Sequence, residues 1–223
     1  MSGFFAPDSA AMRFLTRIAD LMILNVVFIA TSIPIVTIGA ALTGLNFTAM
    51  RLARGQSDST TGDYFRSFRR NFRQATLIWL LVLVMAAVLG AWYLVVATFV
   101  TEPVIEFIVL AIWYLVAFVL ALNVLWVFPY LANFEGTIRE VLRNARLISG
   151  KHVLTSLSAF AIIALSIVVT VFYPQVTAYG LLWLVIGFSG IAFLTGILFS
   201  RVFDKYAPQP TSDAPSDAPS DEE

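Results

Sequence analysis

Residues 77–128 read LIWLLVLVMAAVLGAWYLVVATFV-TEP-VIEFIVLAIWYLVAFVLALNVLWVF and decide the fold. The two apolar stretches, 77–100 and 104–128, each exceed the ~20 residues that a helix rising ~1.5 Å per residue needs to cross a bilayer core. Backbone groups that face hydrocarbon must form hydrogen bonds within their own segment, so the three-residue link predicts two adjacent antiparallel helices. We therefore expect a transmembrane hairpin here.

A second pair of apolar stretches follows at 153–173 and 176–200, with only Pro174 and Gln175 between them. The whole chain is 59% hydrophobic and 13% charged, with a mean hydropathy of +0.85. Soluble domains carry about 25% charged residues, so the composition is that of a membrane protein. We predict an all-α, polytopic transmembrane helical bundle that forms one domain over residues 1–206.

The region before this bundle allows two interpretations, because Pro34 interrupts its apolar residues and Gly39 permits a reversal of the chain. Residues 18–40 could cross the membrane once and lead into an interfacial helix. Alternatively, residues 15–33 and a shorter segment, 40–53, could form a third hairpin.

Charge favours the third hairpin. Short loops rich in Lys and Arg stay on the cytoplasmic side of a membrane. Basic residues occupy the loop 51–73, the loop 139–151 and the end of the last span, whereas the links 101–103 and 174–175 have none. A single first crossing would leave Arg13 and Arg17 outside, and a hairpin keeps them inside. We expect three hairpins, with the N-terminus and the C-terminus both in the cytoplasm.

An eight-residue pattern, Arg-x3-Arg-Asn-x-Arg, occurs twice among these basic residues. Its first copy also contains Arg69, with Phe65, Phe68 and Phe72 on the opposite helical face, so we predict basic amphipathic helices at the cytoplasmic face. The expected partners of that face are anionic lipid headgroups. Two explanations of the repeated pattern are open: an ancestral duplication, or the ordinary accumulation of arginines in cytoplasmic loops. The arginines of this candidate lipid- or partner-binding face are Arg66, Arg69, Arg70, Arg73, Arg139, Arg143 and Arg146.

The last 17 residues, 207–223, hold five acidic residues and no basic one. Serine, aspartate, alanine and proline repeat through this segment, which has too few apolar side chains to form a core. We predict a disordered acidic tail. Cysteine is absent from the chain, which excludes disulfides and cysteine-based metal sites.

Residues for enzymatic chemistry are scarce. His152 is the only histidine, and the chain has neither a phosphate-binding glycine loop nor a nucleophile elbow. We expect no catalytic residue, no metal and no cofactor, and we expect lipid phosphates rather than nucleic acid to be the partners of the arginines. The intramembrane polar residues Asn25 and Asn123 are the better candidates. They either join neighbouring helices by hydrogen bonds or line a path for a solute.

Two stretches resemble the YesL family, bacterial integral membrane proteins named for a domain of unknown function. One contains Pro34-x-x-Thr37-x-Gly39 and continues through residues 65–79, and the other covers 128–135 and the helix that follows. The resemblance, over about residues 12–200, implies a multi-pass protein of the bacterial cytoplasmic membrane that accompanies carbohydrate uptake or sensing systems. It provides no catalytic residue.

These observations favour a non-enzymatic accessory or regulatory membrane protein, with a sugar transporter or a sensor kinase as its partner. The alternative function is that of a small transporter or lipid-handling protein. The Pro34, Thr37 and Gly39 break would then belong to a substrate site, since interrupted helices in repeated transporter folds can mark such sites.

Overall fold

The computed structural model describes residues 10–206, and no strand occurs within that range. Six of its helical segments are long and apolar enough to cross a membrane, which confirms the all-α, polytopic fold class for this part of the chain. The elements in chain order are α1 (Ala10–Ser32), η1 (Ile35–Thr37), α2 (Ile38–Arg54), α3 (Thr60–Phe99), α4 (Pro103–Asn133), α5 (Ile138–Lys151), α6 (Val153–Phe172), η2 (Ala178–Gly180), η3 (Trp183–Gly187) and α7 (Phe188–Phe203).

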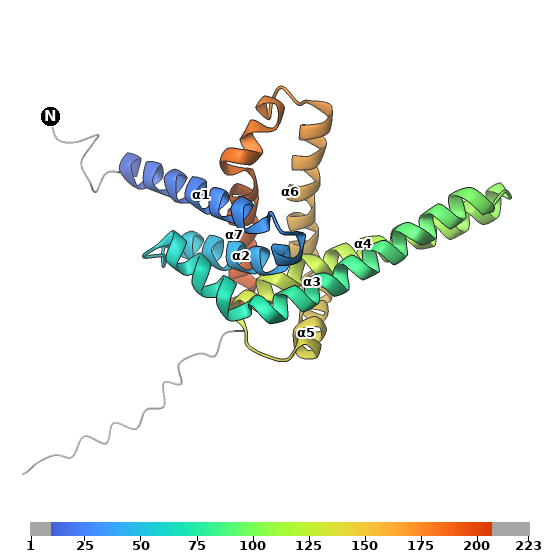
Figure 1. Cartoon of the computed structure of the whole chain (residues 1–223), viewed down its shortest axis with the longest axis horizontal. Coiled ribbons are helices and arrows are strands. Elements are labelled where there is room, and N and C mark those ends of the chain that lie inside the picture. The colour runs from blue at the N-terminus through green and yellow to red at the C-terminus, as the bar shows by residue number, and fades with distance from the viewer. Residues whose placement is uncertain (1–9, 207–223) are drawn as a thin grey trace, which may run out of the picture.

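The break at Pro34 separates α1 from α2, which runs back beside α1 (Figure 1). Pro34 is extended, and the Thr37 hydroxyl can donate to the carbonyl of Thr31 at 2.6 Å or to that of Pro34 at 2.7 Å. The Trp79 indole of α3 donates to the Ile35 carbonyl at 2.8 Å. Backbone acceptors that the break exposes are therefore bonded by side chains.

Gly39 lets α2 approach α3 very closely. A Cβ atom at this position would lie 2.4 Å from the Ala75 carbonyl oxygen and 2.6 Å from the Cβ of Trp79. Both neighbours belong to the main chain or to the base of a side chain, so neither can rotate away. The glycine of the Pro-x-x-Thr-x-Gly pattern is needed for contact between helices.

The two copies of the arginine pattern have different settings. The first lies inside α3, a continuous helix of 40 residues, and forms the N-terminal extension of that span. At ~1.5 Å per residue α3 is about twice as long as a bilayer core is thick, and its basic end extends beyond the apolar part. The second copy forms α5, a separate helix that begins with a capping box formed by Thr137 and Glu140.

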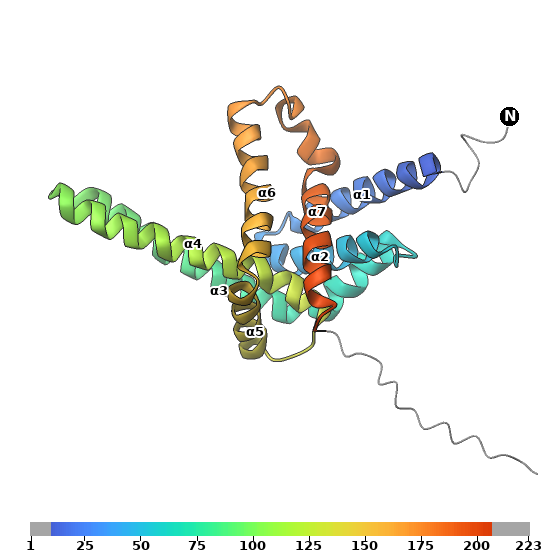
Figure 2. The ribbon, with the colours of Figure 1, turned by 180° about the vertical axis from the view of Figure 1, so that it is seen from behind.

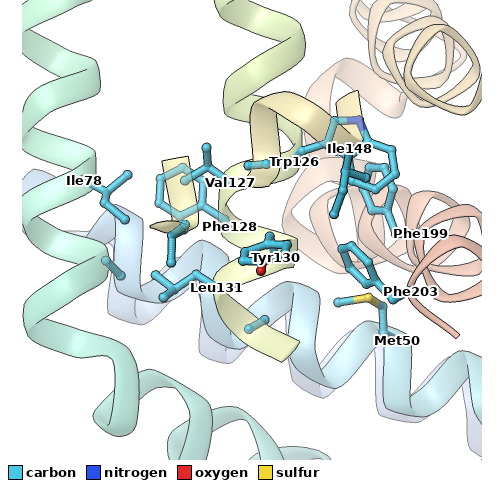
Figure 3. Packing of buried hydrophobic residues seen from close by; sticks show 14 of the residues in the cluster. Met50, Ile78, Trp126, Val127, Phe128, Tyr130, Leu131, Ile148, Phe199 and Phe203 are labelled. Atoms are coloured by element: carbon cyan, nitrogen blue, oxygen red, sulfur yellow. The ribbon is translucent and has the colours of Figure 1, made fainter. Parts of the chain in front are cut away.

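The protein core lies where α4 passes the other helices, at residues 126–132 (Figure 3). Trp126 is fully buried and donates from its indole nitrogen to the Ser156 hydroxyl at 2.7 Å. Its ring packs against Phe199, with ring centroids 4.5 Å apart. Residues from α2, α3, α4, α5, α6 and α7 contribute to this one cluster, which holds the basic ends of the helices together.

Two pairs of helices project from the core in different directions, α3 with α4 and α6 with α7, and each pair turns at its far end (Figures 1 and 2). Within the first pair, Trp113 of α4 donates to the Leu89 carbonyl of α3 at 2.9 Å. Most large apolar side chains of these projecting parts are exposed on the protein surface. This surface is the one expected to contact lipid.

We predict that Gly39→Ala destabilises the protein by about 1–3 kcal/mol, because the added methyl group must push α2 away from α3. Gly90→Ala is the matched control, since a Cβ at Gly90 meets no atom within 4 Å. It should leave stability unchanged or raise it by at most about 1 kcal/mol. Unfolding in mixed detergent micelles, followed by circular dichroism, measures both. Equal loss in the two variants would show that the close approach of α2 and α3 does not limit stability.

Candidate functional site

Asn25 is fully buried and joins α1 to the irregular part of the last membrane helix. Its Nδ2 donates to the carbonyls of Trp183 and Leu184, at 2.9 and 2.8 Å. Its Oδ1 accepts the backbone N–H of Ser189 at 3.0 Å, and the Ser189 hydroxyl donates to the Leu21 carbonyl at 2.7 Å. Every hydrogen-bonding atom of the Asn25 amide therefore has a partner on the other helix or its π-helical segment.

These bonds account for the π-helical turn at Trp183–Gly187. Such a turn adds one residue between a donor and its acceptor, so it interrupts the regular ladder and leaves backbone groups without a partner. In hydrocarbon no water can bond them. The Asn25 amide occupies the interruption and joins α1 to the last membrane helix through these hydrogen bonds.

An apolar cavity of about 420 Å³ lies beside this turn. Five helical elements, α1, α2, α4, α6 and the last membrane helix, provide its walls. Most of its lining is aliphatic or aromatic, and the polar side chains on it include Asn46 and Thr195. Its size and its mostly apolar lining are those of a small-molecule binding site. For brevity we call it the central cavity.

A second apolar cavity of about 360 Å³, the distal cavity, lies between α6 and the last membrane helix. Trp183 and Ile191 line both cavities. The Trp183 indole donates to the Thr170 hydroxyl at 2.9 Å, which fixes the ring against α6. Asn25 thus bonds the backbone carbonyl of a tryptophan that lines both cavities.

Asn123 is not part of this arrangement. Its Nδ2 donates to the Val119 carbonyl of its own helix at 2.6 Å. Its Oδ1 is buried and has no hydrogen-bond partner among residues 10–206, and its side chain lines neither cavity. The structure therefore does not bring Asn25 and Asn123 together. The helix-break residues Pro34, Thr37 and Gly39 also lie outside both cavities.

All seven arginines of the candidate basic face are exposed. Arg66 lies 3.5 Å from the buried carboxylate of Asp63, and Arg70 donates to the Ala132 carbonyl at 3.1 Å. Of these seven side chains, only Arg66 forms an ion pair within the described part of the chain. Their charges are thus available to an outside partner. We use "basic face" for these seven residues.

Ion pairs at the helix ends stabilise this face. Arg51 pairs with Asp63 at 2.8 Å and joins α2 to α3, while Arg54 pairs with Asp204 at 2.6 Å and brings the ends of α2 and α7 together. On α5, the backbone N–H and hydroxyl of Thr137 lower the pKa of Glu140 by bonding its charged form.

The pKa of His152 is lowered by partial burial and then by Lys205 and Lys151. The histidine bonds Tyr206 at 3.0 Å. Among residues 10–206, no group of three or more His, Cys, Asp or Glu side chains is placed to hold a metal ion.

Three features of the site could not be predicted from the sequence. Asp63 is the buried acid that two arginines share, yet it looked like one more loop charge. Asn46 could not be separated from other small polar residues near Gly39. The π-helical turn has no local signal, because its hydrogen-bond partner, Asn25, lies 158 residues earlier in the chain. The acidic tail, residues 207–223, lies outside the described residues.

Residues 21–93 are similar to a family described as "Protein of unknown function, DUF624". The match covers about a third of the chain and includes Asn25, the Pro34 break and most of α3. The chain has no significant match among curated proteins or among solved structures.

We predict that Asn25→Leu destabilises the protein by about 2–4 kcal/mol, because it removes three hydrogen bonds in a site without water. Asn123→Leu is the matched control, with the same change of side chain, and should alter stability by less than about 1 kcal/mol, since its carbonyl already lacks a partner. Detergent unfolding followed by tryptophan fluorescence tests both. A loss of the same size in the two variants would contradict the role assigned to Asn25.

Proposed function

We propose that this protein is a non-enzymatic accessory or regulatory component of a carbohydrate uptake or sensing system in the bacterial cytoplasmic membrane. The observation that carries the proposal is the basic face, with seven exposed arginines on two helices anchored to one core. The resemblance to the YesL family supports the link to carbohydrate systems.

The basic face suits two partners at once. Each arginine near an anionic membrane surface contributes about 1 kcal/mol to binding, so part of the face anchors the helices in the headgroups. The remaining arginines are free to meet acidic side chains of a sugar transporter or a sensor kinase. Contacts of this kind steer association and respond to salt, as a regulatory interaction requires.

We propose to test the partner with three neutralised residues, Arg66→Gln, Arg69→Gln and Arg73→Gln, combined in one variant. Arg70 is kept because it bonds Ala132. The control variant carries lysine at the same three positions and retains the charge. Crosslinking in native membranes should recover a transporter or kinase partner with the unchanged protein and the lysine variant, and several-fold less with the glutamine variant. Repeated recovery of the protein alone would contradict the proposal.

The proposed orientation places the basic face and the C-terminus in the cytoplasm, following the rule for Lys and Arg. The chain has no cysteine, so a single cysteine introduced by mutation reports on which side of the membrane its position lies. We predict that cysteine at Thr101 reacts with a membrane-impermeant reagent in intact cells. Cysteines at Phe14 and Asp58 should react only after the membrane is opened. Reaction of Phe14→Cys from outside would overturn the first hairpin.

The central cavity favours a second candidate function, that of a small transporter or lipid-handling protein. Its walls come from five helical elements, and an interrupted helix forms one side. Broken membrane helices can mark substrate sites. Purified protein in vesicles would then move solutes or labelled lipids across the bilayer. The absence of movement over a broad panel of both would remove this candidate.

A further inference from the structure

Asn46 of α2 presents an unused hydrogen-bond acceptor at the central cavity. The residue is only 9% exposed, and its side chain lines the cavity wall. Its Nδ2 donates to the Leu42 carbonyl at 2.8 Å, one helical turn earlier, while no described residue donates to its Oδ1. This oxygen is not enclosed by protein atoms, so a ligand or water that enters the cavity can donate to it.

Most side-chain donors that line the two cavities are already in use: Thr195 donates to Ile191, Trp183 to Thr170, Ser166 to Ile162, Thr170 to Ser166 and Thr177 to Pro174. Asn46 Nδ2 uses one of its two hydrogens on the Leu42 carbonyl and leaves the other free. A ligand whose polar group only accepts hydrogen bonds, such as an ester, would leave the Oδ1 of Asn46 without a donor. The polar group of a suitable ligand must donate to this oxygen, and a hydroxyl can also accept from the free Nδ2 hydrogen.

The charge of the cavity lining further limits the class of ligand. Neither cavity is lined by an ionisable side chain. Burial of a phosphate or ammonium group without a counter-charge is very unfavourable, so charged headgroups do not fit. The remaining lining is apolar and matches hydrocarbon.

The positions of the two cavities predict the orientation of the ligand. The central cavity holds Asn46, and the distal cavity runs past Trp183 and Ile191 to Thr177, near the far turn between α6 and α7. A hydroxyl at Asn46 would therefore lie toward the core of the protein. The hydrocarbon chain would extend between α6 and the last membrane helix, away from the basic face (Figure 1).

We propose that the two cavities bind one neutral long-chain alcohol, whose hydroxyl donates to Asn46 Oδ1 and whose hydrocarbon chain passes Trp183 into the distal cavity. This inference goes beyond both candidate functions, because such a ligand can be a regulator, a structural lipid or a transported molecule. It also gives the π-helical turn a purpose, since Asn25 fixes the backbone that carries Trp183.

The test uses the full-length protein in vesicles of phosphatidylglycerol and phosphatidylcholine. One set contains a long-chain alcohol with a photoreactive diazirine, and the other contains the fatty acid of the same length and label. After illumination, peptides are identified by mass spectrometry. We expect the alcohol to label α2 near Asn46 and the facing parts of α6 and α7. Excess unlabelled alcohol should compete, and the fatty acid should not.

Variants separate the cavity from the lipid-facing surface. Asn46→Leu should reduce labelling by the alcohol about fivefold to tenfold, the value of one hydrogen bond. Asn123→Leu, the control, should not reduce it, because Asn123 also bonds its own helix but lies outside the cavities.

Gly190→Phe provides a second variant that does not depend on Asn46. A Cβ at Gly190 would have 3.9 Å of space to its nearest neighbour, Ile186, so a larger side chain can enter the distal cavity and exclude the hydrocarbon chain. Labelling should fall here as well. Equal labelling by alcohol and fatty acid, or full labelling of a folded Asn46→Leu protein, would overturn the proposal.

Discussion

The structure depends on one constraint, that backbone polar groups inside hydrocarbon must find partners within the protein. Two breaks in the membrane helices challenge it, and side chains from other helices resolve both. At Pro34, the Trp79 indole of α3 bonds the exposed carbonyl of Ile35. At the π-helical turn, the Asn25 amide bonds the carbonyls of Trp183 and Leu184. Each break therefore becomes a joint between helices, and these joints fix α1 relative to α3 and α7.

The sequence predicted the features that follow from length and composition. Three of the four long apolar runs, 77–100, 104–128 and 153–173, lie almost entirely within α3, α4 and α6, and the break between α1 and α2 falls at Pro34. The last span differs, because residues 178–180 form a short 3-10 turn and the regular helix α7 begins only at Phe188. Local patterns could not show this, because the polar group that stabilises the irregular turn comes from α1. A polar residue in an apolar run indicates that a hydrogen-bond partner is present, but the sequence does not identify which helix provides it.

The repeated arginine pattern shows a similar limit. Spacing along a helix fixes which side chains share a face, but not what that face meets. In the first copy, Asn71 is buried and bonds Ser67 on its own helix. In the second, Asn144 bonds the Tyr130 hydroxyl of α4. The arginines are therefore exposed in both copies. The asparagine between them bonds its own helix in the first copy and α4 in the second.

Three asparagines in apolar surroundings show how the environment of one amide determines its role. Asn25 uses both its donor and its acceptor on another helix, so it is structural. Asn46 and Asn123 both bond the carbonyl one turn earlier in their own helices, which leaves the Oδ1 of each without a donor in the described chain. The difference is that Asn46 lines a cavity, whereas the Oδ1 of Asn123 is enclosed by protein. An unpaired acceptor can select a ligand only where a ligand has room to reach it, so Asn46 is the polar group from which a specific role for the cavity can be argued.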